Sequence, residues 1–268
     1  MVCVMPERLL IARWTVATFP LSLLRGDTMK KVFICAGHGG RYTGAVSANG
    51  KYIEKDNNLA IARAIHGREI NVPGVVFTYA RLKDIHFSNN LMDDLIHRCH
   101  MANQSGADIF IAIHQNADIH QKGYGAETFS LAEVGEGRKI ATAVQKKMVV
   151  NTDLYDRGIK TANFVVLRET AMPAILVEAG FVGGDPEEAR YVSQQGTISK
   201  IAEGILMGLC DYLGVEYGYK PKWSPQQEVD RLVEDGVINT PRDHKQQVSW
   251  GEFATVLNRA RDGRIILC

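Results

Sequence analysis

The sequence predicts an α/β protein built on a twisted, mostly parallel sheet of about six strands with helices on both faces. A small helical C-terminal module is expected to follow this fold. Short runs rich in β-branched residues alternate along the chain with segments of helical periodicity. Several of these runs stop at a His or Glu, and the composition changes near residue 215. These observations together favour one α/β domain with a catalytic edge.

Strands are expected where β-rich runs are bounded by turn residues. The runs are 31–35, 75–79, 109–114, 126–131, 163–168 and 174–178. Helical periodicity marks 55–70, 88–104 and 136–150. It also marks a long segment with Ile198, Ile201, Ile205, Leu209 and Tyr212 on one stripe. Such apolar stripes are expected to pack against the sheet.

The chain divides into four predicted parts. Residues 1–28 are an extension with little fixed structure, and 29–214 form the main domain. Residues 215–223 are a linker, because Tyr, Gly and Pro accumulate there. Residues 224–268 form a small helical module that mediates binding or self-association, or that packs on the main domain.

Composition excludes several functional classes. The 268 residues carry a net charge of +1, which argues against a nucleic-acid partner. No apolar run is long enough to span a membrane. Residues 1–28 are a poor secretory signal, since charges interrupt the apolar patches. The protein is therefore expected to stay in the cytoplasm until lysis releases it. The five Cys are scattered, without a disulfide or thiolate-metal spacing.

Four polar residues form the candidate site. His38 lies in the Gly37–Gly40 loop after the first strand, and His114 ends the third strand. Glu54 lies between them, and Glu178 ends the last predicted strand. In an open α/β sheet, strand ends place such side chains at a common edge. The set His38, Glu54 and His114 has the composition of a catalytic zinc site with one open position. Glu178 then accepts the proton of the attacking water, and its apolar surroundings are expected to raise its pKa.

Residues 30–213 resemble the zinc-dependent N-acetylmuramoyl-L-alanine amidases of the Amidase_3 type. The resemblance rests on these stretches: Cys35–Gly40 with Gly44-Ala45, Glu54–Ala60, Thr78–Arg81 with Asp84, Arg98 with Ala102-Asn103, Ala107–Ala117, Gly125–Thr128 and Pro173–Phe181. Cys35-Ala36 stands where the family has Asp-Pro, and Ala112 stands where it often has Ser. The resemblance implies one Zn²⁺ held by His38, Glu54 and His114, with Glu178 as the catalytic residue. It also implies peptidoglycan as the substrate, cleaved between N-acetylmuramic acid and L-alanine by an endolysin or an autolysin. The module at 224–268 resembles small helical modules of wall-lytic proteins, which implies wall binding as one of its roles.

Alternatives remain open at this stage. The chain could be a non-catalytic wall-binding protein of the same fold, or a zinc amide hydrolase acting on a soluble substrate. Asn116 is equally consistent with a substrate contact and a turn residue. Arg81 could meet a substrate carboxylate, although an internal Asp partner is favoured. His97 and His100 are expected on a solvated helix surface, since their spacing does not suit a second metal site.

Overall fold

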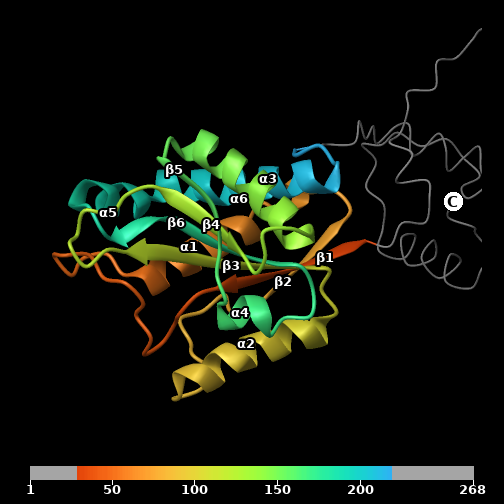
Figure 1. Cartoon of the computed structure of the whole chain (residues 1–268), viewed down its shortest axis with the longest axis horizontal. Coiled ribbons are helices and arrows are strands. Elements are labelled where there is room, and N and C mark those ends of the chain that lie inside the picture. Colours follow the sequence, from red (N-terminus) through yellow and green to blue (C-terminus); the bar gives the residue numbers. More distant parts are fainter. Residues whose placement is uncertain (1–28, 219–268) are drawn as a thin grey trace, which may run out of the picture. The chain divides into compact units, whose positions relative to one another are not determined.

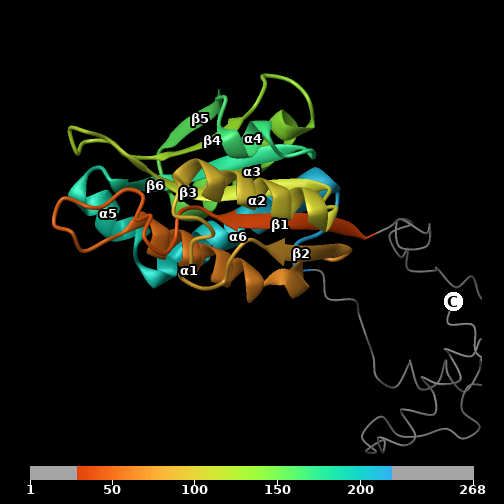
Figure 2. The same cartoon turned by 90° about the horizontal axis from the view of Figure 1, so that it is seen from below.

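The computed structural model describes residues 29–218, whose centre is a six-stranded sheet with helices on both faces (Figure 1, Figure 2). The predicted extension 1–28, the helical module 224–268 and most of the linker 215–223 lie outside the described residues. The predictions of wall binding and self-association for that module therefore stay predictions.

The sheet is mostly parallel, as predicted. Its strands are β1 (Lys30–Ala36), β2 (Val75–Tyr79), β3 (Ile109–Ala117), β4 (Ala126–Ser130), β5 (Asp156–Thr161) and β6 (Ala174–Gly183). They lie in the order β2-β1-β3-β6-β4-β5. Every neighbouring pair is parallel except β6 and β4, which are antiparallel. Strands that are distant in sequence are therefore neighbours in the sheet. β3 and β6 form the central pair.

Six α-helices flank the sheet: α1 (Glu54–His66), α2 (Leu91–Ser105), α3 (Glu136–Thr152), α4 (Val165–Arg168), α5 (Pro186–Val192) and α6 (Gln195–Leu213). A short 3-10 helix, η2 (Glu69–Asn71), follows α1. The side chain of Asn90 caps α2 by accepting from Asp93 N at 3.2 Å, which satisfies a free N–H of the first turn. Within residues 29–218, no helix is both long and apolar enough to cross a bilayer.

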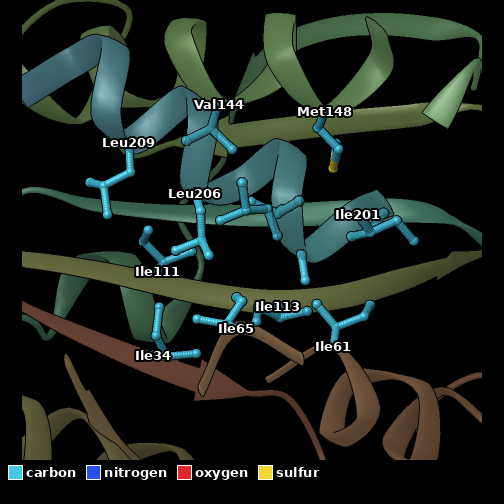
Figure 3. Packing of buried hydrophobic residues seen from close by; sticks show 14 of the residues in the cluster. Ile34, Ile61, Ile65, Ile111, Ile113, Val144, Met148, Ile201, Leu206 and Leu209 are labelled. Atoms are coloured by element: carbon cyan, nitrogen blue, oxygen red, sulfur yellow. The ribbon is translucent and has the colours of Figure 1, made fainter. Parts of the chain in front are cut away.

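Two hydrophobic clusters hold the layers together, one on each face of the sheet. The larger joins β-strand isoleucines to α1, α3 and α6 (Figure 3). In that view, Ile111 and Ile113 of β3 lie between Ile65 of α1 and Leu206 of α6. The smaller cluster packs β1, β3 and β6 against α2 and α4. The sheet is therefore covered on both faces, in agreement with the predicted fold class.

Helices α3 and α6 pack closely because α6 carries glycines at the contact. A Cβ atom added at Gly208 would lie 2.4 Å from Val144 Cα of α3. Backbone atoms cannot yield as a flexible side chain can, so we expect Gly208→Ala to lower the free energy of unfolding by about 1–3 kcal/mol. Urea denaturation measures this change.

Gly196 provides the matched control in the same helix. An added Cβ there meets no atom within 4 Å. Because alanine has the higher helix propensity, Gly196→Ala is expected to leave stability unchanged or slightly raised. Equal effects of the two substitutions would contradict the close packing of α3 on α6.

The strand predicted at 163–168 is wrong. This segment contains the short helix α4 (Val165–Arg168), and the strand lies earlier, as β5. Val166 and Leu167 are buried in the smaller cluster, so their apolar, β-branched pattern reflects burial on a helix. Strand β5 was missed because its sequence, DRGIKT, has a single large apolar residue and lies at the sheet edge. Helix α5 was not predicted either.

Candidate active site

The carboxyl ends of β1, β3 and β6 meet at one edge of the sheet, marked by the arrowhead of β3 in Figure 1. His38 follows β1, His114 lies on β3, and Glu178 lies on β6. His114 and Glu178 are direct neighbours in the β3–β6 register. The structure therefore brings these predicted residues together at the predicted edge.

The loop after β1 presents His38 in an unusual backbone conformation. Its φ angle is +59°, in the left-handed region that L-residues with side chains rarely adopt. Glycines make room around it. A Cβ at Gly37 would lie 2.3 Å from His114 Cε1, and one at Gly44 would lie 2.3 Å from Glu54 Oε2. The backbone can approach these side chains this closely only where glycine stands.

Glu54 opens α1 and lies between the two histidines. Its Oε1 is 2.9 Å from His114 Nδ1 and 3.2 Å from His38 Nε2. Its Oε2 accepts a hydrogen bond from Ala45 N at 2.8 Å. The N-terminal turn of a helix favours a negative charge, which helps to keep this buried carboxylate ionised. The contacts of Glu54 thus tie together the loop after β1, helix α1 and strand β3.

The three side chains form a candidate metal site. One donor atom from each of His38, Glu54 and His114 can be chosen so that all lie within 4.8 Å of one another. Burial raises the pKa of Glu54, but hydrogen bonds from His114 and His38 outweigh it and hold that pKa well below its usual value. Burial lowers the pKa of His114, which favours the neutral imidazole that metals bind. An ionised carboxylate and imidazole nitrogens in a glycine-lined cradle fit a divalent metal ion.

Two buried arginines hold the loop that carries His38. Arg98 donates to Ala36 O at 2.8 Å and to His38 O at 2.7 Å. Arg81 donates to Ala36 O and Gly37 O at 3.1 and 2.8 Å. Arg81 also donates to two further main-chain carbonyls and is only 2% exposed. These contacts give Arg81 a role in positioning the loop, and they do not include the internal Asp partner that was favoured from the sequence. The predicted contact with a substrate carboxylate stays a prediction.

We expect Arg98→Met to lower the free energy of unfolding by about 3–5 kcal/mol. Arg98 and Asp94 form an ion pair at 2.6 Å with both side chains at most 2% exposed. The substitution removes the cation that pairs with the buried Asp94 and the donor to His38 O, while Ala36 O keeps its hydrogen bond from Arg81. Urea denaturation measures the loss. The control, Arg190→Met, removes a surface pair whose arginine is 56% exposed, and a change below about 1 kcal/mol is expected. Similar losses in both variants would contradict the loop-holding role.

Glu178 lies beside the candidate metal site, and one oxygen of its carboxylate has no hydrogen-bond partner. Its Oε2 is buried without a hydrogen-bond partner. Burial raises the pKa of Glu178 well above its usual value, and repulsion from Glu54 and Glu127 adds to the effect. The predicted upward shift is confirmed in direction. A buried polar atom without a partner is costly in a folded protein, so this oxygen calls for a bound water, ion or substrate as its partner.

A pocket of about 280 Å³ opens beside these residues. His38, His114 and Glu178 line it together with apolar side chains of the α2 and α4 region. Its apolar lining includes Leu91, Leu95, Phe164, Val165, Val166 and Leu176. The arrangement suits a substrate that places a hydrolysable bond at the metal cluster and an apolar group in the pocket.

Asn116 contacts a carboxylate that sequence reasoning did not single out. Its Nδ2 donates to Glu127 Oε1 of β4 at 2.8 Å, and Glu127 is 3% exposed. Arg157 Nε donates to Glu127 Oε2 at 2.7 Å, and Lys160 binds the same oxygen. The structure thus shows Asn116 orienting Glu127, and its predicted substrate contact stays a prediction. Glu127 reaches the site because β4 pairs with β6, and the sequence did not predict this strand order.

His97 and His100 lie on the exposed face of α2, as expected. They are not part of the His38, Glu54 and His114 cluster. Cys35, Cys99 and Cys210 are free and buried, which fits the prediction that the cysteines form no disulfide framework. Cys3 and Cys268 lie outside the described part of the chain.

Comparisons with known proteins all point to the same protein family. Residues 32–211 match the Amidase_3 family, described as N-acetylmuramoyl-L-alanine amidase. The chain is 39% identical over 183 residues to the amidase CwlM of Bacillus licheniformis, covering 68% of each sequence. It is 32% identical to the amidase LytC of Bacillus subtilis, of which the match spans 35%.

A solved structure agrees in fold. The N-acetylmuramoyl-L-alanine amidase from Clostridium difficile 630 is 35% identical, with a TM-score of 0.65. The match covers 70% of this chain and 98% of that one. Together with the strand-edge site, these matches show that the chain belongs to the N-acetylmuramoyl-L-alanine amidase family.

Proposed function

We propose that this chain is a zinc-dependent hydrolase of bacterial peptidoglycan. It cleaves the amide between the lactyl group of N-acetylmuramic acid and L-alanine of the stem peptide, in wall lysis or remodelling. The observation that carries the proposal is the cluster of His38, Glu54 and His114 beside the unsatisfied Glu178 oxygen. His38, His114 and Glu178 line one pocket together. Family membership supports the substrate class.

His38, Glu54 and His114 are the proposed zinc ligands. Imidazole nitrogen and carboxylate oxygen are the usual donors in catalytic zinc sites that keep an open position. Zinc bound by such ligands polarises a carbonyl group and lowers the pKa of water to about 7. Arg98 and Arg81 hold the carbonyls of the loop, so His38 keeps its left-handed backbone conformation. Asn58 donates to Glu54 Oε1 at 3.1 Å and fixes the carboxylate.

Glu178 is the proposed proton carrier. It takes a proton from the attacking water as the hydroxyl oxygen bonds to the lactyl carbonyl carbon. It then gives this proton to the departing nitrogen as the carbon–nitrogen bond breaks, which yields a free acid and the L-alanine amino terminus. Burial suits this role because an elevated carboxyl pKa lets one group both accept and return a proton near neutral pH.

Two alternatives predict different products. A non-catalytic wall-binding protein would have no use for a buried, unpartnered Glu178. A zinc amide hydrolase for soluble substrates would act on small acylated peptides and not on intact wall. The proposed location of action is the bacterial wall, reached after the protein is released by lysis.

The test is to incubate zinc-loaded protein with purified peptidoglycan and with a soluble muramoyl peptide. New L-alanine amino termini are then followed by labelling and mass spectrometry. We expect release from peptidoglycan. Release from the soluble substrate alone would favour the soluble-substrate hydrolase, and release from neither would favour the wall-binding protein.

A further inference from the structure

A bulge in β5 places two cations beside the candidate active site. β5 pairs with β4 in a register that joins Ala126 to Asp156 and then Thr128 to Ile159, so two residues of β5 oppose Glu127. Gly158 supplies the bulge with a φ of +78°. Residues three apart in a regular strand point to opposite faces. The extra residue in the bulge brings Arg157 and Lys160 back to the same face of the sheet. Both side chains bind Glu127 Oε2.

Glu127 connects these cations to the strand that carries Glu178. Glu127 and Glu178 are direct partners in the antiparallel β4–β6 ladder. Side chains of such partners begin about 5 Å apart. Because Arg157 and Lys160 both bind Glu127, this carboxylate stands between the two cations and the proposed proton carrier.

The cluster has a surplus of positive charge. Glu127 is the single carboxylate in ion-pair contact with Arg157 and Lys160 among residues 29–218. The neighbouring carboxylate of Glu188 accepts from the backbone N–H groups of Gly125 and Phe181. The side chains of Arg157 and Lys160 are 32% and 41% exposed. Besides Glu127, Arg157 donates to Tyr124 O and lies over the Phe181 ring, whereas Lys160 has no second carboxylate partner among the described residues.

The other side of Glu178 has a different character. There the pocket is lined mainly by apolar side chains, and its buried ion pair, Arg98 with Asp94, is fully engaged. An anionic group would lose its hydration in that pocket without gaining a free cation. An acidic group of the substrate is therefore favoured on the side of β4 and β5 and disfavoured in the pocket.

We propose that Arg157 and Lys160 bind a carboxylate of the stem peptide, on the residue that follows L-alanine. The inference rests on the proposed function and makes these residues determinants of substrate specificity. The leaving peptide then runs over β4 and β5, away from the apolar pocket. A free carboxylate is favoured over its amide, because two cations share only one protein carboxylate.

Two soluble muramoyl tripeptides test the proposal. Both have an amidated C-terminus, and they differ in whether the carboxylate after L-alanine is free or amidated. We expect wild type to have at least a tenfold higher kcat/KM on the free acid, mainly through KM. Lys160→Met should abolish this preference, and Lys160→Arg should retain it. Lys139→Met, at an exposed lysine of α3, is the control and should behave as wild type.

The outcomes separate the two levels of the account. Cleavage of both substrates by wild type without preference overturns the carboxylate site and leaves the proposed function standing. An equal loss on both substrates in Lys160→Met also overturns it, since the lysine would then serve only to neutralise Glu127. A zinc-loaded wild type that cleaves neither substrate overturns the inference, and failure to cleave peptidoglycan as well overturns the proposed function.

Discussion

Glu178→Gln is expected to lower the rate of L-alanine release from peptidoglycan by about 10²–10⁴-fold, the usual contribution of a general acid–base group. Glutamine keeps the size and polarity of the side chain but cannot accept or return a proton. It also removes a buried carboxyl group whose pKa is raised by burial and by nearby carboxylates. The fold and the bound metal should therefore be preserved while the reaction fails.

The measurement is the initial rate together with metal content and melting temperature. Glu187→Gln is the control, since this glutamate is 80% exposed on α5, and it should retain wild-type activity. A Glu178→Gln enzyme with bound metal and more than about a tenth of the wild-type rate would assign proton transfer to another group.

His114→Ala is expected to remove the metal and, with it, essentially all hydrolysis. His114 is the central partner of Glu54 at 2.9 Å and one of the three proposed ligands. Wild type should also gain stability from zinc. Binding to the folded state alone contributes about 2.7 kcal/mol when free zinc is about 100 times Kd. The variant should show no such gain, so its melting temperature should not respond to zinc.

Metal content by atomic emission and melting curves with and without zinc measure this prediction. His100→Ala is the matched control on the exposed face of α2 and should keep both zinc and activity. If His114→Ala retained stoichiometric zinc, this histidine would not be a ligand.

The sequence predicted the location of the candidate site because parallel strands end at a common edge. His38, His114 and Glu178 each follow a buried apolar run, and the pleat and register of β1, β3 and β6 align those ends. The positions of these three residues could therefore be predicted without knowing the tertiary structure. The position of Glu54 could not, since its closeness to both histidines depends on how the segment around Gly44 turns back.

Other features depend on contacts that no local pattern encodes. β5 has few apolar residues because it is an edge strand, and its neighbour β4 pairs with β6 in the opposite direction. The meeting of Glu127 with Lys160 therefore follows from strand order and a bulge. Arg81 could not be placed from sequence either, because its partners are main-chain carbonyls, which every residue carries.

The central claim is that zinc is bound beside Glu178, and anomalous X-ray scattering at the zinc edge tests it most directly. Crystals of the zinc-loaded protein should show one peak per chain. The peak should lie about 2.0–2.2 Å from a nitrogen of His38, a nitrogen of His114 and an oxygen of Glu54. A zinc ion bound by other residues would contradict the account. Full hydrolytic activity of protein that shows no zinc peak would contradict it as well.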